Sequence, residues 1–487
     1  MDMALPSIDL GSIAPELIVT GTALVVLLVD LFLPKYRREG LAYLSLLGLA
    51  LAFGFSLFLW GKGRFAFKES ISLDPYSLFF TSLFLFITFL TILISKGYLE
   101  REEIQRGEYY ALLLFATLGM MILAKGMDLV VLFLGLETFS IPLYILAGFM
   151  RTRLQSNESA LKYLLLGAFS SGFLLYGIAF IYGATGSTNL KRVIEFLGRE
   201  GTLADPFLFI GASLLIVGFG FKVATVPFHM WAPDVYEGAP TSVTAFMIAG
   251  TKAAAFSAFL RVFLYSLNPL KPDWSAVLWI LAILTMTLGN VVAIAQQNIK
   301  RMLAYSSIAH AGYILVAVVA GGELGASSIL FYLLAYAFMN LGAFSVVILL
   351  GQKGEENLNL SDYAGVGYRH PLASLAMTIF MFSLAGIPPT AGFMGKFYIF
   401  SAAVKAGYLD LAIIGVLNSV VSVFFYLRVI VMMYMQEPGP ERVPGYAPPA
   451  LAIAMIVAVW GTFQLGLFPG PFLELALRSV RPLLGIL

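Results

Sequence analysis

Four ionisable residues lie inside long apolar stretches of this 487-residue chain. Glu137 lies midway along LVVLFLGLETFSIPLYILAGF, Lys222 and Lys252 fall near the middle of two later stretches, and Lys396 ends a fourth. An ionisable side chain at the centre of a membrane helix costs about 2.5 to 3.5 kcal/mol on insertion scales, and such residues usually face a bundle interior or a water-filled path. The pattern therefore predicts a buried path that handles charge.

The residue types favour protons over sodium as the transported ion. Sodium requires oxygen ligands, whereas lysine offers only hydrogen-bond donors. If Glu137 pairs with a buried lysine, each lowers the insertion cost of the other, and a lysine that can lose its partner becomes a switchable proton site. His229 and His310 are each open to two interpretations, a proton relay near neutral pH or a hydrogen-bonded core histidine.

The remaining charges in or beside apolar stretches have simpler interpretations. Lys162 lies near a helix start, where function and a side chain that extends to the membrane surface are both open. Arg428 is undecided between function and structure. Arg261, near a helix end, and Lys125, at a loop, are expected to be structural, with Lys125 at the membrane interface.

Composition excludes several classes of protein. Hydrophobic residues make up 60% of the chain and charged residues 12%, against roughly a quarter charged in soluble domains. The net charge of +2 gives no basic patch for nucleic acid. With no cysteine, the chain has no disulfide, thiolate nucleophile or cysteine-ligated cluster. The segments GFMGKF and GFGFKV lack the residues that complete a nucleotide-binding motif.

About 20 mostly apolar residues span a bilayer as a helix, and the chain supplies fourteen such stretches. Their predicted cores are 13–33, 41–60, 78–95, 110–124, 129–149, 160–182, 207–229, 242–264, 274–295, 302–320, 327–350, 372–397, 409–435 and 449–467. The first is expected to remain as an anchor, since no lysine or arginine precedes it. Segment 473–483 is predicted to lie on the membrane surface, and 183–205, the longest polar stretch, is only long enough for a loop.

Two of these helices are predicted to be broken. In the seventh, Pro227 follows Lys222 by five residues, and Pro233 and Pro240 are expected to end the helix. Unpaired backbone groups at membrane depth are tolerated only where they face protein or water, so a break indicates a polar interior. A simple proline kink is the alternative interpretation.

The twelfth helix carries the second predicted break, at Pro388 and Pro389, just before Lys396. The two breaks lie five helices apart, and an odd-numbered repeat places its second copy upside down, which is the inverted-repeat pattern of secondary transporters. We therefore predict two inverted repeats, helices 4–8 and 9–13. The chain then divides into 1–109, 110–264 (first repeat), 265–435 (second repeat) and 436–487.

Charged loops suggest an orientation. Lys35, Arg37 and Arg38 directly follow the first helix, which by the positive-inside bias places the N-terminus outside, and fourteen crossings return the C-terminus to that side. Basic residues at 62–68 and 191–199 would then also lie outside, against the bias.

Four segments carry a resemblance to a known family. FKVATVPFHMWAPDVYEGAPTSVTAF, SSIAHAGYIL, LAGIPPTAGFMGKF and FLGLETFSIPLYIL resemble subunit N of the proton-pumping NADH:quinone oxidoreductase, respiratory complex I. The likeness covers essentially the whole chain. PFHMWAPDVYEGAP is specific for the wider antiporter-like group, which includes Mrp-type subunits. Lys396 resembles subunit N, since subunit M usually has a glutamate there, and the long lateral helix of subunit L is missing.

The resemblance implies a role for each buried charge. Glu137 would pair with Lys222 in a first half-channel, Lys252 would link the halves, and Lys396 would serve the second, with Lys162 and His310 on the same axis. It also implies that FMN, iron–sulfur clusters and quinone are bound by partner subunits and none by this chain. The partners would be other membrane-arm subunits, including neighbouring antiporter-like ones, in a bacterial inner membrane with both termini periplasmic.

The resulting hypothesis is a proton-translocating subunit of a translocase, in which electron transfer elsewhere shifts the charge states of these residues. Two alternatives differ in class. One is an Mrp-type cation/proton antiporter subunit or a membrane-bound hydrogenase antiporter-like subunit. The other is a scaffold that keeps the buried charges as fixed ion pairs.

Overall fold

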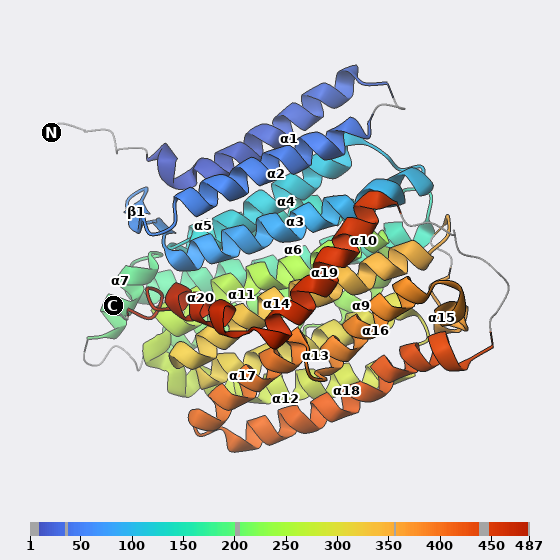
Figure 1. Ribbon diagram of the computed structural model, residues 1–487. Helices are drawn as coiled ribbons and strands as arrows, with labels where there is room; N and C mark the ends of the chain where they lie inside the picture. The colour runs from blue at the N-terminus through green and yellow to red at the C-terminus, as the bar shows by residue number, and fades with distance from the viewer. Residues whose placement is uncertain (1–8, 35–37, 200–204, 355–356, 438–447, 486–487) are drawn as a thin grey trace.

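The computed structural model describes residues 9–34, 38–199, 205–354, 357–437 and 448–485, and these form a bundle of long, roughly antiparallel helices (Figure 1). Thirteen helices in this part of the chain are long and apolar enough to cross a membrane, and a broken pair, α16 and α17, supplies one more crossing. The all-helical membrane fold predicted from the sequence is therefore confirmed. Lys35 and Arg37, which carry part of the orientation argument, lie outside the described residues.

The crossing elements follow the predicted order. They are α1 (Ala14–Phe32), α2 (Gly40–Phe58), α3 (Pro75–Arg101), α4 (Gly107–Lys125), α5 (Leu129–Ala147), α6 (Leu154–Thr185), α8 (Pro206–Val223), the compound helix α10–η4–α11–η5 (Thr241–Phe246, Met247–Thr251, Lys252–Leu260, Arg261–Ser266), α12 (Lys271–Ala295), α13 (Ile299–Ala320), α14 (Gly322–Leu350), α16 (Pro371–Ala385) with α17 (Ala391–Lys405), α18 (Leu409–Met435) and α19 (Pro449–Leu467).

Short elements join these helices. They are η1 (Leu10–Ile13), β1 (Arg64–Ala66), β2 (Ile71–Leu73), α7 (Leu190–Leu197), α9 (Trp231–Gly238), η6 (Asn268–Leu270), η7 (Leu360–Tyr363), α15 (Val366–Arg369) and α20 (Gly470–Val480). Side-chain caps fix several helix starts, because the first amides of a helix have no internal partner. Asp128 caps α5, Asp205 caps α8, and Asn298 caps α13.

The compound helix Thr241–Ser266 forms the centre of the bundle. All residues in its most apolar 18-residue stretch are buried, and nearly all are buried in the corresponding stretches of α13 and α14. In α1, α18 and α19, only about a third of the residues in that stretch are buried. Single π-helical turns often occur at functional sites, and one such turn, Met247–Thr251, directly precedes Lys252. Lys252 is thus a fully buried residue of this central helix.

The seventh helix breaks earlier than predicted. The expected core 207–229, ended by Pro233 and Pro240, is wrong in its end: α8 stops at Val223, Pro233 lies inside α9, and Pro240 precedes α10. Ala224 adopts a left-handed conformation (φ 60°), and the Thr225 amide donates to the Gly220 carbonyl at 2.8 Å. This reversal closes the helix before Pro227 is reached.

The twelfth helix breaks where the prolines predict. Gly386 at φ 88° ends α16, the Ile387 amide donates to the Phe382 carbonyl at 2.9 Å, and α17 begins at Ala391. A residue with a Cβ is strained at this φ, which explains the glycine. Both α8 and α16 thus end at a residue in the left-handed conformation.

Two local structures were missed by the sequence analysis. β1 and β2 pair antiparallel, with Arg64 opposite Leu73, in a segment read as loop. The stretch 183–205 contains α7, whose N-cap Asn189 donates its side-chain amide to the Glu69 carbonyl at 3.0 Å. The hairpin and α7 thus meet at one end of the bundle, where α20 also lies (Figure 1). Both elements are too short to show the hydrophobic periodicity by which a long helix is predicted from sequence.

Lys125, expected to be an interfacial side chain, is buried inside the protein at the end of α4. Its side chain is 1% exposed and forms an ion pair with Glu16 at 2.7 Å, because α4 packs against α1. Arg261 is structural as predicted, with both Asp74 carboxylate oxygens at 3.0 Å and the Ala124 carbonyl at 2.8 Å from its guanidinium nitrogens. Arg428 donates to the carbonyls of Ile294 and Gln296, at 2.8 and 2.5 Å, and so caps the end of α12.

We predict that Arg261→Ala destabilises the chain by about 3 to 5 kcal/mol, because it leaves the Asp74 carboxylate without its buried partner. The pair is enclosed, with side-chain exposures of 2% for Arg261 and 13% for Asp74. The midpoint of thermal unfolding in detergent measures the effect. The control is Arg481→Ala, whose pair with Glu323 is exposed and should contribute less than about 1 kcal/mol. Equal effects of the two variants would contradict the prediction.

Candidate functional site

Lys222 lies in the last turn of α8, just before the break, and its side chain is almost fully buried. Its ammonium donates to the Ser140 hydroxyl at 2.9 Å and reaches the Tyr144 hydroxyl at 3.5 Å, both on α5. The rings of Phe139 and Tyr144 each lie 5.8 Å from the nitrogen. The charge is therefore offset by neutral oxygens and aromatic faces.

Glu137 lies three residues before Ser140 on α5 and is partly buried. It accepts a short hydrogen bond from the Ser171 hydroxyl on α6. The position of α5 is fixed by close backbone contact with α4, since a Cβ on Gly119 would come within 2.3 Å of the Phe139 amide nitrogen. Pro142, inside α5, removes an amide donor one turn after Thr138, which leaves a polar backbone group beside Glu137.

The structure brings Glu137 and Lys222 into one site without direct contact. Among the described residues, their charged groups form no ion pair within 4.0 Å. Ser140, three residues after Glu137 on α5, accepts the hydrogen bond from Lys222 instead. The pairing implied by the family resemblance is therefore not a closed ion pair in this conformation. Hydroxyl groups fill the position that the partner carboxylate was expected to occupy.

Lys252 is fully buried at the centre of the bundle. Its ammonium makes a short hydrogen bond to the carbonyl of Ser307 on α13. His310 follows one turn later on the same helix, so both groups face the same interior. Lys252 thus faces the second predicted repeat rather than Lys222.

His310 is the centre of a hydroxyl-rich cluster. One ring nitrogen makes a short contact with the Tyr332 hydroxyl of α14, and the other lies 3.0 Å from the Tyr426 hydroxyl of α18. The Tyr426 hydroxyl is in turn 2.5 Å from Ser306. Each of these groups can both donate and accept a hydrogen bond, so the cluster can pass a proton. It is also a satisfied core histidine, so the geometry is compatible with both interpretations of His310.

Lys396 is held against the broken end of α16. Its ammonium donates to the carbonyls of Leu384 and Ala385, at 3.0 and 2.9 Å, and to the Ser419 hydroxyl at 2.8 Å. The last carbonyls of a helix lack internal partners and carry partial negative charge. The break therefore creates the acceptors that solvate this lysine.

A cavity of about 600 Å³ opens beside Lys396 between α17 and α18. Its wall is mainly apolar and includes Phe397 and Val420, and Ser401 and Ser419 add hydroxyls. Lys405, the last residue of α17, also lines it, so the cavity extends toward that end of the helix. The cavity gives Lys396 a route toward the periphery of the chain.

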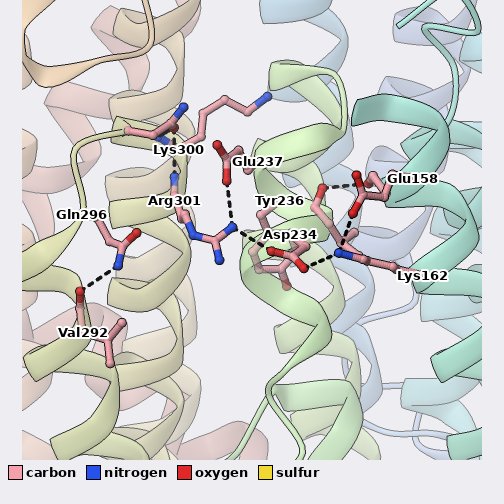
Figure 2. Close-up of polar contacts among 12 residues, drawn as sticks. Glu158, Lys162, Asp234, Tyr236, Glu237, Val292, Gln296, Lys300 and Arg301 are labelled. Atoms are coloured by element: carbon pink, nitrogen blue, oxygen red, sulfur yellow. Dashed lines mark hydrogen bonds and ion pairs between the residues drawn. The ribbon is translucent and has the colours of Figure 1, made fainter. Parts of the chain in front are cut away.

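Two predicted supporting residues lie elsewhere. His229 is in the loop between α8 and α9, where burial lowers the pKa of its imidazole, and among the described residues its side chain contacts none of the buried lysines. Lys162 forms ion pairs with Glu158 and Asp234, each at 2.6 Å, in a partly exposed cluster at one end of the bundle (Figure 2). Figure 2 also shows Asp234 between Lys162 and Arg301, a residue that the sequence analysis did not single out.

The missed site residues are mostly hydroxyls and aromatics within apolar helices. They are Ser140, Tyr144, Ser171, Trp231, Asp234, Arg301, Ser306, Ser307, Tyr313, Tyr332, Ser419 and Tyr426. A sequence signal existed for several of them. Ser140 is one helical turn from Glu137, and Ser306, Ser307 and Tyr313 each lie within about one turn of His310 on the same helix. Ser171, Asp234, Arg301, Tyr332, Ser419 and Tyr426 come from elements that the sequence does not place near the buried charges.

Comparisons with known proteins identify the family of this chain. The family model described as NADH:quinone oxidoreductase/Mrp antiporter, TM, matches residues 126–422. NADH-quinone oxidoreductase subunit N of Trichlorobacter lovleyi is 52% identical over 476 residues, 98% of each chain. The chain belongs to this family. The subunit N of Chloroflexus aggregans is 49% identical over 487 residues, 99% of each chain.

Solved structures match as well. A chain of respiratory complex I from Thermus thermophilus with bound Aureothin is 38% identical, with a TM-score of 0.81 over 95% of this chain and 99% of that one. A chain of the Mrp complex from Dietzia shares the fold, with a TM-score of 0.85 over 98% of each chain but 21% identity. These matches confirm the resemblance to subunit N and the antiporter-like fold.

We predict that a cysteine placed in the cavity beside Lys396 reacts with a small charged thiol reagent. The chain has no cysteine, so Ser401→Cys introduces a unique thiol, and Ser345→Cys in fully buried α14 is the matched control. Because reactivity follows thiol exposure, Ser401→Cys should label roughly tenfold faster, as measured by mass spectrometry of this chain. Equal labelling rates would mean that the cavity is closed.

Proposed function

We propose that this chain conducts protons as a membrane-arm subunit of NADH:quinone oxidoreductase, with Glu137, Lys222, Lys252 and Lys396 as the groups that hold them. The chain is a subunit N of complex I, a multi-pass membrane protein of a bacterial translocase. Its contribution is to couple electron transfer on other subunits to proton movement across the membrane.

One observation supports the assignment of these residues most strongly. Lys222, Lys252 and Lys396 are buried inside the bundle with neutral oxygen acceptors, whereas buried Lys125 and Arg261 each contact a carboxylate. Lys300 is also buried and donates to the Ala239 carbonyl, but it lies in the first turn of α13, at the end of the bundle. A fixed ion pair stabilises a buried charge at all times, but a lysine without one is costly to keep protonated. The three unpaired lysines are therefore suited to gain and lose protons.

The geometry suggests an order along the bundle. Glu137 and Lys222 form the first half-channel, and Lys252 turns away from them toward Ser307 and the histidine cluster. Lys396 follows, with the cavity between α17 and α18 as its outlet. In this scheme, Glu137 moving toward Lys222 stabilises its ammonium, and Glu137 moving away drives the proton toward Lys252.

Redox cofactors are assigned to the partner subunits. The chain has no cysteine for iron–sulfur ligation, and in the described part of the chain no three histidines or carboxylates are arranged so that they could hold a metal ion together. We assign FMN, the iron–sulfur clusters and the quinone to other subunits, and neighbouring antiporter-like subunits as direct contacts of this chain. The charged loop after α1 supports periplasmic termini and a cytoplasmic position for the cluster around Arg301.

We predict that Lys222→Ala, in the assembled complex, abolishes proton pumping and slows NADH:quinone turnover, because the first half-channel loses its proton-holding group. The measurement is protons pumped per NADH oxidised in inverted membrane vesicles, with assembly checked by the content of the complex. Lys353→Ala is the control, because its pair with Glu103 is exposed at a loop and contacts no buried lysine.

Wild-type pumping by Lys222→Ala would refute the proposed role. The antiporter alternative has its own signature, since vesicles that contain only this chain would then show sodium-dependent proton flux. A scaffold would leave both NADH oxidation and pumping unchanged.

A further inference from the structure

Five charged side chains meet at one end of the bundle and surround the short helix α9 (Figure 2). We name Glu158, Lys162, Asp234, Glu237 and Arg301 the α9 cluster. Arg301 contacts Asp234 at 2.7 Å and Glu237 at 2.8 Å, while Lys162 contacts Asp234 and Glu158, each at 2.6 Å. Asp234 is thus shared by two cations from opposite sides.

The cluster joins the two predicted repeats. Lys162 comes from α6 and Asp234 from α9, in the first repeat, whereas Arg301 comes from the first turn of α13, in the second. Burial raises the pKa of Asp234, but hydrogen bonds from Lys162 and Arg301 outweigh this, and the pKa lies below its usual range. Asp234 is therefore an anion at neutral pH and holds both cations.

Side chains of α6 and α13 also donate hydrogen bonds to backbone carbonyls in and just after α9. The Ser159 hydroxyl of α6 donates to the Val235 carbonyl at 2.9 Å, and the Lys300 ammonium of α13 donates to the Ala239 carbonyl at 2.6 Å. Gly238 packs so closely on α6 that a Cβ there would lie 2.3 Å from the Gln155 carbonyl oxygen. The short helix α9 is thus held between α6 and α13.

Trp231, the first residue of α9, links this helix to the end of α8, where Lys222 lies. Trp231 donates its indole N–H to the Phe221 carbonyl at 3.0 Å, and so satisfies a backbone group at the broken end of α8. Its ring stacks on Tyr163 with centroids 4.7 Å apart, and Tyr163 packs against Tyr144 at 4.8 Å. A shift of α9 therefore moves the group that caps α8 next to Lys222.

We propose that Lys162, Asp234, Glu237 and Arg301 are positioning residues for Lys222, which hold α9 and Trp231 in place and link the first half-channel to α13. This inference rests on the proposed function. Since α13 also carries the Ser307 carbonyl that binds Lys252, and His310, a movement of α13 reaches both half-channels through Arg301. Exposed ion pairs contribute little to stability, so the effect of this cluster is on geometry rather than on folding.

The test is a double-mutant cycle on the shared pair in the assembled complex. Arg301→Gln and Asp234→Asn should each lower protons pumped per NADH roughly threefold. The double variant should lower it by less than the product of the two single effects, because both single variants remove the same Arg301–Asp234 contact. Arg301→Lys should recover most of the pumping, since an ammonium can still pair with Asp234. Hydrogen exchange of residues 224–239 should speed up in Arg301→Gln, with no change elsewhere in the chain.

Controls separate this inference from the proposed function. Lys353→Gln removes an exposed ion pair outside the α9 cluster and should leave pumping and exchange unchanged. If Lys222→Ala abolishes pumping while Arg301→Gln has wild-type pumping, the positioning role is wrong and the proposed function stands. If Lys222→Ala pumps normally, the proposed function itself fails.

Two further outcomes would overturn the positioning role. One is an additive loss in the double variant without recovery by Arg301→Lys, and the other is faster exchange throughout the chain, which indicates general destabilisation. If Arg301→Gln does not assemble, Glu237→Gln takes its place, because it removes one of the two carboxylates on Arg301 and keeps the Asp234 contact. It should lower pumping by a smaller factor, and wild-type pumping there would also count against the inference.

Discussion

Charge inside an apolar helix bundle must be offset locally, and the chain meets this constraint in two different ways. Lys125 and Arg261 are paired with carboxylates and tie distant helices together. Lys222, Lys252 and Lys396 instead contact hydroxyls and backbone carbonyls. A carboxylate partner stabilises a buried cation, and a cation that contacts only neutral oxygens is costlier to keep charged. The lysines proposed to hold protons differ from Lys125 and Arg261 in the type of their partners.

The two broken helices supply part of that offset. Both α8 and α16 end in a left-handed residue, yet the chain satisfies their last carbonyls differently. At α8 the indole of Trp231 binds the Phe221 carbonyl, and at α16 the ammonium of Lys396 binds the final carbonyls directly. Lys222 precedes its break and contacts hydroxyls on α5, while Lys396 follows its break and binds the freed carbonyls.

Helix α13, the second helix of the proposed second repeat, contacts several parts of the candidate site. Its first turn holds α9 through Arg301, and its middle offers the Ser307 carbonyl to Lys252 and places His310 among tyrosines. Nearly all of α13 is buried, so it cannot move without repacking its neighbours. Under the proposed function, α13 is therefore a helix that contacts groups of both half-channels.

The sequence by itself determined the membrane class, the order of the helices, both breaks and the buried charges, because apolar length, proline and an ionisable residue at mid-span are local signals. It also carried the family resemblance that the comparisons confirm. The tertiary structure alone decided which charges are paired. Lys125 was read as interfacial, but α1 brings Glu16 to it, and the expected contact of Glu137 with Lys222 is replaced by hydroxyls. These partners are 34 to 109 residues apart and leave no periodic trace in the chain, since only the packing of separate helices brings them within hydrogen-bonding distance.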